Sequence, residues 1–110
     1  MSKTDQVYLQ DVLDSINKIE DFVGDYDYKQ FEVDDRTQFA IFHALEIIGE
    51  ASYKLSKSFL AQNPSFPARE AVEMRNFLIH GYDEVEIGVV WKTIKESLPI
   101  LKDQVKRCLD

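Results

Sequence analysis

The spacing of apolar residues along the chain predicts α-helices almost throughout. In the first segment these residues recur at steps of three and four, the period of one helix face. The positions concerned are Val12, Leu13, Ile16, Ile19 and Val23. We therefore expect a helix over about 4–23, with Ser2-Lys3-Thr4-Asp5 as a capping box and Gly24 as its end. The connection that follows contains Phe31 and Val33, which we expect to anchor it to the core.

The middle of the chain carries a longer pattern of the same period. It predicts one helix over about 35–62, with Asp34 or Asp35 as its cap and Asn63-Pro64 as its end. The apolar stripe comprises Phe39, Ile41, Phe42, Leu45, Ile47, Ile48, Leu55 and Phe59. Gly49 lies within this stretch and is small enough to let another helix cross closely.

Two further helical patterns occupy the rest of the chain. A helix is expected over about 67–80, beginning at the proline and capped by Gly81. Asp83-Glu84-Val85-Glu86 is expected to open the next helix, where acidic side chains favour the positive end of the dipole. Its apolar face comprises Ile87, Val90, Trp91, Ile94, Leu98, Ile100, Leu101, Val105 and Leu109, and Pro99 must kink it or begin a new helix. The predicted fold is all-α, an antiparallel bundle of four to five helices in one domain, residues 1–110.

Charge is unevenly distributed along this pattern. The chain carries 20 acidic and 13 basic residues, a net charge of −7. Residues 1–35 hold ten of the acidic residues and three of the basic ones, so the remaining two thirds are balanced. The acidity therefore does not exclude a polyanionic substrate for the balanced part, where seven basic residues could line its path. These are Lys54, Lys57, Lys92, Lys95, Lys102, Lys106 and Arg107.

Several classes of site are excluded by composition. One cysteine, Cys108, rules out an intrachain disulfide and a multi-cysteine metal site. The two histidines, His43 and His80, lack the carboxylate spacing of a metal site, and we expect no metal and no cofactor. No apolar run is long enough for a membrane span, and no signal peptide precedes the first helix, so a cytoplasmic protein is expected.

The segment from Met74 to Tyr82 is the best candidate for chemistry. Arg75, Asn76, His80 and Tyr82 surround a short apolar run there. On a helix Tyr82 lies almost over Arg75, whereas His80 lies about 140° around the axis. Arg75 and His80 can therefore act on one substrate if the helix ends near His80, as Gly81 suggests, or if two subunits contribute.

A purely structural role for the same residues stays open on spacing alone. Arg75 can pair with Glu46 or Glu50 of the preceding helix, and a histidine is common at a helix end, where a cation complements the dipole. Tyr82 can be an ordinary half-buried aromatic. His43 is expected at the surface or an interface without a chemical role, Cys108 as an inert or mildly exposed thiol, and Trp91 in the core.

Together with its surroundings, this segment resembles a known family. Arg75-x4-His80-x-Tyr82 is preceded by Leu45-Glu46-Ile47-Ile48-Gly49-Glu50-Ala51 and followed by Val90-Trp91-Lys92-Thr93-Ile94 and Leu98-Pro99-x-Leu101. This combination is similar to the HepT-like branch of the HEPN superfamily and covers nearly the whole chain. Gly81 departs from the larger, often acidic residue expected between the histidine and the tyrosine, which affects the loop and not a catalytic group.

The resemblance implies a small all-α homodimer that acts as a metal-independent endoribonuclease toxin of a type II/VII toxin–antitoxin system. Arg75 and His80 would then form the ribonuclease site in a cleft at the dimer interface, and Asn76 would position the substrate. Tyr82 would be the residue that an MntA-like minimal nucleotidyltransferase antitoxin modifies with AMP, which silences the toxin.

The residue types suit that chemistry. His80 titrates near neutrality and can exchange a proton with the 2′-hydroxyl that attacks the phosphate, while Arg75 can stabilise charge on phosphate oxygens. An AMP on Tyr82 would add bulk and negative charge close to His80. Two alternatives remain at this point: a non-catalytic helical partner that binds and regulates a nucleotidyltransferase, and an unrelated structural bundle. RNase activity of the isolated chain and its oligomeric state discriminate between the three.

Overall fold

The computed structural model describes residues 1–81 and 85–110, apart from the side chain of His80. Within these residues every regular element is helical, which confirms the all-α prediction. The elements are α1 (Lys3–Val23), α2 (Tyr28–Glu32), α3 (Asp35–Tyr53), α4 (Lys57–Gln62), α5 (Ala68–His80), α6 (Ile87–Lys92), the π-helical turn η2 (Thr93–Ser97) and α7 (Leu98–Leu109).

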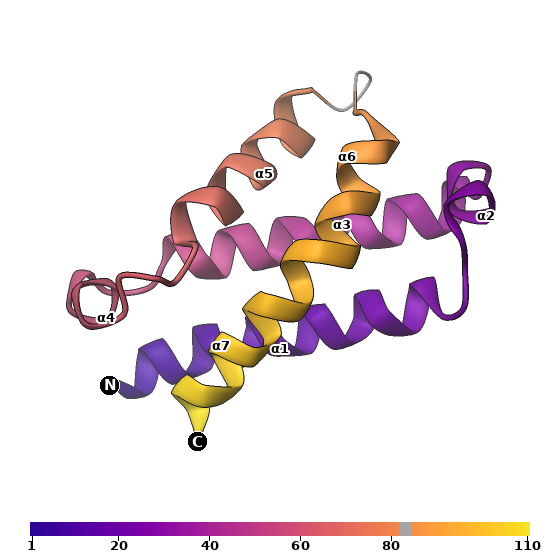
Figure 1. Cartoon of the computed structure of the whole chain (residues 1–110). Helices are drawn as coiled ribbons and strands as arrows, with labels where there is room; N and C mark the ends of the chain where they lie inside the picture. The colour runs from indigo at the N-terminus through magenta and orange to yellow at the C-terminus, as the bar shows by residue number, and fades with distance from the viewer. Residues whose placement is uncertain (82–84) are drawn as a thin grey trace.

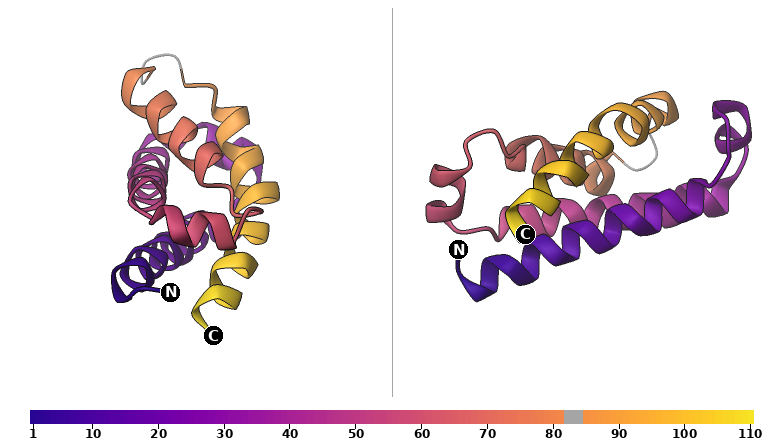
Figure 2. Two further views of the ribbon diagram at one scale, coloured as in Figure 1. Left: turned by 90° about the vertical axis from the view of Figure 1, so that its left-hand side faces the viewer. Right: turned by 60° about the horizontal axis from the view of Figure 1, so that its bottom comes forward.

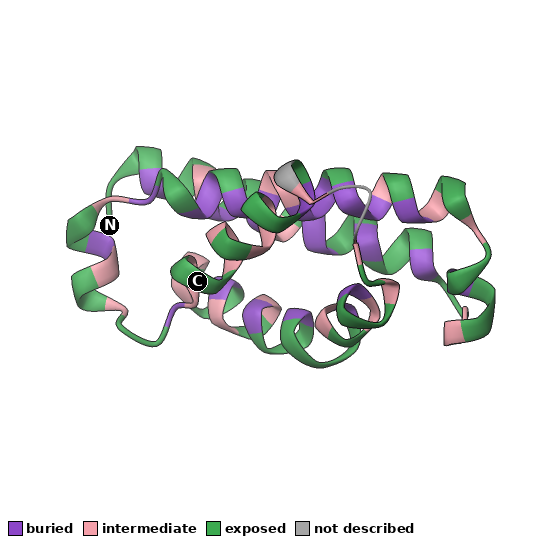
Figure 3. Cartoon of the chain, turned by 90° about the horizontal axis from the view of Figure 1, so that it is seen from above, coloured by how far each residue is buried: buried purple, intermediate pink, exposed green. Residues whose placement is uncertain are grey.

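The long helices form a bundle around one core. α1 and α3 lie antiparallel and side by side, α5 crosses α3, and α6, η2 and α7 follow one another along a rod that packs across α1 (Figures 1 and 2). α1, α3, α5 and the α6–η2–α7 rod each contribute apolar side chains that are almost completely buried. Examples are Ile16, Ile41, Leu78, Val90 and Val105. The buried faces of the helices point toward one another and the exposed faces point outward (Figure 3).

The single helix predicted over 35–62 is two helices, which corrects the sequence-based expectation. α3 ends at Tyr53, and α4 starts after Ser56, whose hydroxyl caps the new helix by accepting from the backbone N–H of Phe59. The break is held by Asp5 of α1. Its carboxylate accepts hydrogen bonds from the Ser56 backbone N–H at 2.9 Å and from the Ser56 hydroxyl at 2.6 Å. A contact 51 residues away along the chain thus fixes Ser56 at the start of α4.

Asp5 also corrects the expected capping box. Ser2 accepts from the backbone N–H of Asp5 as predicted, but the Asp5 side chain is directed to Ser56. Asp5 is only 3% exposed. Burial acts to raise the pKa of its carboxyl, the hydrogen bonds from Ser56 and Ser2 act to lower it, and the net pKa lies below its ordinary value.

Replacing Asp5 by alanine is expected to lower the free energy of unfolding by about 2–3 kcal/mol, because the Ser56 donors lose a charged acceptor in a buried position. Since the folded pKa of Asp5 is depressed, its contribution is complete above the ordinary carboxyl pKa. That contribution is lost as the pH falls through the folded value. Urea unfolding followed by Trp91 fluorescence at pH 7 and at lower pH measures both effects. Asp11→Ala, at an exposed position of the same helix, is the control. Equal losses for the two variants would contradict the role of Asp5.

Other local expectations are confirmed or corrected residue by residue. Gly24 ends α1 with a φ of 51°, and Asp34, not Asp35, caps α3. The Tyr26 hydroxyl and the Thr37 groups donate to the Asp34 carboxylate and lower its pKa to about 2. Phe31 is completely buried as predicted, whereas Val33 is 80% exposed and anchors nothing.

The remaining corrections concern apolar side chains and the start of α6. Phe39 and Ile100 were expected on buried faces and are exposed. α6 begins at Ile87, after Glu86, so Val85 and Glu86 are not its first turn; residues 83 and 84 lie outside the described part. Pro99 lies in the first turn of α7 and cannot donate a backbone hydrogen bond, and the wider π turn comes directly before it.

Candidate functional site

The crossing of α3 and α5 places Arg75. Gly49 of α3 lies directly beneath α5, and a Cβ atom built there would stand 2.7 Å from the carbonyl oxygen of Ala71 and in collision with the Arg75 Cβ. A glycine is therefore required for the two backbones to approach this closely, as the sequence suggested. The consequence is that the stem of Arg75 rests on the α3 backbone and its guanidinium reaches along the α3 surface.

Three neighbours hold the Arg75 guanidinium. Its Nη1 donates to Oε2 of Glu50 at 2.5 Å, and its Nε and Nη2 donate to Oδ1 of Asn76 at 3.2 and 2.8 Å. Its Cζ lies 5.5 Å from the ring centroid of Tyr53, in cation–π contact. The pairing with Glu50, one of the two partners considered from sequence, is therefore confirmed.

The pairing leaves Arg75 able to bind an anion. A guanidinium has five N–H donors, and three are used by the described partners. One hydrogen on each terminal nitrogen remains, which matches two oxygens of a phosphate. The Arg75 side chain is 18% exposed and that of Glu50 is 50% exposed, so the pair lies at the surface and is open to a ligand.

The other predicted site residues are placed in part. Asn76 is exposed and uses its carbonyl oxygen to orient Arg75, while its amide nitrogen has no acceptor within the described residues. α5 ends at His80, and the backbone N–H of Gly81 caps it by donating to the carbonyl of Phe77 at 2.8 Å. α5 thus ends at the histidine of the motif, the position at which the sequence analysis placed its end. Tyr82 and the side chain of His80 lie outside the described residues.

Tyr53 is the neighbour of Arg75 that the sequence analysis did not single out. It lies three residues after Glu50 and therefore on the same face of α3. The sequence did hold a signal for Tyr53. It is an aromatic residue on the polar side of a predicted helix, one turn from Glu50, a candidate partner of Arg75. The expected long helix over 35–62 obscured it, because Tyr53 then appeared in the middle of a helix and not at its end.

The charges around α5 favour one side of it for a phosphate backbone. A hollow of about 850 Å³ between α5 and α6 is lined by Glu70, Glu73 and Glu86, whose carboxylates repel phosphate. Arg75 and Asn76 do not line it. The lining of the α5–α6 hollow therefore disfavours a phosphate backbone there.

The predicted basic path is divided between two regions. Lys54 directly follows Tyr53 and lies over the Tyr8 ring of α1, Lys57 is the first residue of α4, and both are exposed. The other five basic residues belong to the α6–η2–α7 rod, where Lys102 forms an ion pair with Glu20 at 2.5 Å and Lys95 lies over the Trp91 ring. Of these residues Lys54 is the one that directly follows Tyr53, whose ring contacts Arg75.

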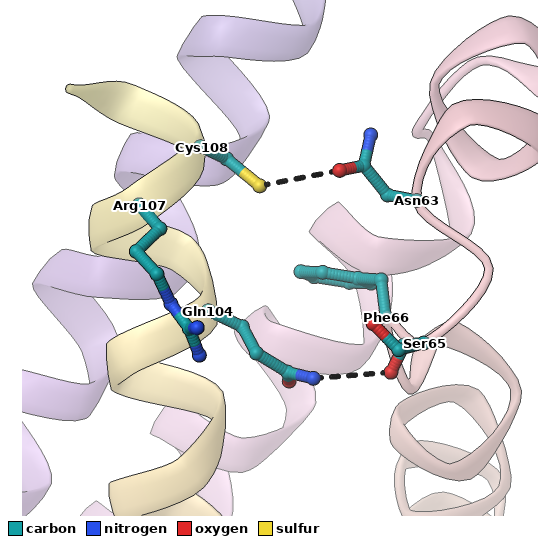
Figure 4. Close-up of a pocket in the computed structure, with 6 residues that line it drawn as sticks. All are labelled: Asn63, Ser65, Phe66, Gln104, Arg107 and Cys108. Carbon is teal, nitrogen blue, oxygen red and sulfur yellow. Dashed lines mark hydrogen bonds between the residues drawn. The ribbon is translucent and has the colours of Figure 1, made fainter.

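A second cavity lies far from the motif along α5. About 230 Å³ in volume, it lies between the residues before α5 and the end of α7 and includes Asn63, Gln104 and Cys108 (Figure 4). The Cys108 Sγ donates weakly to Asn63 Oδ1 at 3.7 Å, and burial raises the pKa of the thiol. Cys108 is thus half-buried, where the sequence suggested an inert or mildly exposed thiol.

The described residues contain neither a metal site nor a membrane-spanning helix. No group of three or more histidine, cysteine, aspartate or glutamate side chains is arranged there to hold a metal ion. No helix in the same part of the chain combines the length and the apolar character that crossing a membrane requires. His43 is exposed on α3, consistent with a surface position, and Trp91 is partly buried against Phe31.

Comparison with known proteins finds one family over most of the chain. The family described as "Ribonuclease HepT-like" matches residues 12–108. A protein named "Probable ribonuclease HepT" from Thermococcus cleftensis is 41% identical over 107 residues, which are 97% of each chain. "Putative RNase MJ1380" from Methanocaldococcus jannaschii is 39% identical over 107 residues, 96% of this chain and 98% of that one.

A third relative carries the same unit within a longer protein. "Gamma-glutamylcyclotransferase and putative RNase MJ0434" from Methanocaldococcus jannaschii is 33% identical over 110 residues, which are the whole of this chain and 50% of that one. No solved structure matches this chain.

Proposed function

The chain belongs to the HepT-like ribonuclease family and is an RNA endonuclease, and from this premise we propose that it cuts RNA without a metal ion, using Arg75 and His80. The observation that carries the proposal is the arrangement of Arg75. Its stem is seated on Gly49, its guanidinium is oriented by Glu50 and Asn76, and two N–H groups remain for a phosphate. Such a preorganised cation stabilises the charge that develops on phosphate during transfer.

The cleavage step divides between the substrate and two side chains. The 2′-hydroxyl oxygen of RNA attacks the adjacent phosphorus, the 5′-oxygen leaves, and a 2′,3′-cyclic phosphate remains. His80 takes the proton of the attacking hydroxyl or supplies one to the leaving oxygen, and Arg75 holds the nonbridging oxygens. The amide nitrogen of Asn76 is a donor for a phosphate or ribose oxygen beside them.

We further propose that the active form is a homodimer whose cleft contains two copies of this segment. The Arg75 side chain is 18% exposed in the single chain, and Ile79, which precedes His80, is 51% exposed. A second copy related by a two-fold axis would cover this apolar side chain and enclose the site. Two copies of His80 could then share the acid and base roles. The mass in solution tests this directly, and a monomer that cleaves RNA would contradict it.

The expected test of the activity is cleavage in the presence of EDTA. Purified protein should cut single-stranded RNA with excess chelator and leave 2′,3′-cyclic phosphate and 5′-hydroxyl ends, because the attack uses the substrate's own hydroxyl. Mass spectrometry of the fragments identifies these ends. Substrate with 2′-O-methyl groups at every position should stay intact. A chain that binds a nucleotidyltransferase but never cleaves RNA would instead be the non-catalytic regulatory partner.

We propose that the activity is controlled at Tyr82 by an MntA-like minimal nucleotidyltransferase antitoxin, as in a toxin–antitoxin pair acting in the cytoplasm. The Tyr82 oxygen would attack the α-phosphorus of ATP and release pyrophosphate, which leaves AMP on the ring. Tyr82 follows the end of α5 by two residues, so the added phosphate would stand near the cleft and repel RNA. The acidic first third of the chain is then available to a basic surface of the antitoxin.

Co-expression with a neighbouring nucleotidyltransferase gene should increase the mass of the chain in steps of one AMP. The increase should disappear in Tyr82→Phe, because that ring has no hydroxyl, and should persist in Tyr53→Phe, a matched change at a described tyrosine. Intact-protein mass spectrometry reads the result. An AMP that remains on Tyr82→Phe would place the modification elsewhere.

A further inference from the structure

Tyr53 is an exposed aromatic residue immediately beside Arg75. Its side chain is 67% exposed, and its ring does not belong to the buried core. It ends α3, one turn after Glu50, and its ring centroid lies 5.5 Å from the Arg75 Cζ. Packing therefore does not account for a large aromatic side chain at this position.

On the basis of the proposed function, we propose that Tyr53 is the stacking platform for the nucleobase next to the phosphate that Arg75 binds. Each nucleotide of a single strand carries one phosphate and one base, so a base lies close to any bound phosphate. Proteins that hold single-stranded RNA commonly pair a cationic group for the backbone with an aromatic ring for a base. Arg75 and Tyr53 reproduce this pair on one surface.

Two basic residues follow Tyr53 along the chain. Lys54 and Lys57 are both exposed, and the Lys54 ammonium lies over the Tyr8 ring of α1, 5.9 Å from its centroid. The nearby carboxylates are already engaged, since Glu50 is paired with Arg75 and Asp5 with Ser56. A strand that places a phosphate at Arg75 and a base on Tyr53 thus does not meet an unpaired carboxylate at Glu50 or at Asp5.

Two other roles for the ring have different consequences. If Tyr53 only holds the guanidinium of Arg75, its removal weakens the binding of every phosphate strand, with or without bases. If the ring is covered by a second copy of the chain, its removal changes the oligomeric state. A stacking role predicts an effect that depends on the presence of bases and leaves the oligomeric state unchanged.

The experiment compares two uncleavable probes by fluorescence anisotropy. One is a 2′-O-methyl oligouridylate, and the other is an abasic strand of the same length and charge. Tyr53→Ala is expected to weaken binding of the oligouridylate about 10- to 100-fold, the range for loss of one stacked base, and to leave binding of the abasic strand unchanged. Tyr53→Phe should bind both probes like the wild type. Phe22→Ala, which removes an exposed ring from α1, is the matched control and should also bind normally.

Each other outcome overturns the proposal in a distinguishable way. Equal weakening for both probes would reduce Tyr53 to a positioning residue for Arg75, and an altered mass of Tyr53→Ala in solution would assign the ring to an interface. Equal binding of the two probes by the wild-type protein would contradict the stacking role of Tyr53 but not the proposed function. Wild-type protein that binds neither would contradict the proposed function itself. Since neither probe can be cleaved, the result does not depend on Arg75 and His80 being catalytic.

Discussion

Replacing His80 or Arg75 by alanine is expected to slow RNA cleavage by about 100-fold or more while leaving the protein folded. Loss of the proton-transfer group at His80 should reduce the rate about 100- to 10,000-fold. Loss of the Arg75 cation should reduce it about 100- to 1,000-fold, because charge on the phosphate is no longer stabilised. Arg75→Lys should recover little activity, since an ammonium keeps the charge but not the two-pronged geometry. Initial rates on a labelled oligonucleotide in EDTA measure all three variants.

Arg69 provides a matched control for Arg75. It lies on α5 as well and pairs with a glutamate, Glu73, at an exposed position. Arg69→Ala removes the same charge from the same helix and should retain wild-type cleavage. Unchanged cleavage by His80→Ala would remove that residue from the mechanism, and equal losses for Arg69→Ala and Arg75→Ala would show a general effect of charge.

Gly49→Ala is expected to destabilise the fold by about 1–3 kcal/mol and to reduce cleavage beyond the fraction that unfolds. Within a helix this substitution ordinarily stabilises by up to about 1 kcal/mol. Here the added methyl group would stand 2.7 Å from the Ala71 carbonyl oxygen, which is backbone and cannot rotate away. α3 and α5 must therefore separate, at the cost of an overpacked contact. Arg75 moves with α5, away from Glu50.

Gly88 is the control for this prediction. It lies in α6, and a Cβ atom there would meet the Tyr28 hydroxyl at 3.7 Å, an ordinary contact. Gly88→Ala should be neutral or slightly stabilising and should not affect cleavage. Urea unfolding and single-turnover cleavage under saturating protein separate the two effects. A stabilised Gly49→Ala with normal activity would show that the α3–α5 crossing tolerates a side chain.

Sequence patterns predicted helix bounds correctly where the interactions that set those bounds lie within one or two turns. The helix expected over 4–23 is observed as Lys3–Val23, and Gly24 and Gly81 end their helices as predicted. Caps and apolar periodicity act within one or two turns, so they are visible in a short stretch of sequence. The pairing of Arg75 with Glu50 was predictable as one of two choices because both candidates lay near Gly49, the residue that permits the crossing.

Errors arose where a distant residue overrides a local pattern. Ser56 is the only local sign of a new helix between 50 and 60, and its contact with Asp5 of another helix is not visible in the sequence. Val33 and Ile100 match apolar patterns and yet face solvent, because the packing of neighbouring helices decides which face of a segment is covered.

The sequence alone determined the helical class, most helix ends and the motif with its resemblance to a family, since each depends on residue types at short and regular spacings. Only the tertiary structure decided how Arg75 is held, through Gly49, Glu50 and Asn76, and that Tyr53 stands beside it. It also decided that the helix expected over 35–62 is divided by a buried carboxylate of α1. The physical reason is that these features depend on contacts between segments distant in sequence, which periodicity within one helix does not encode.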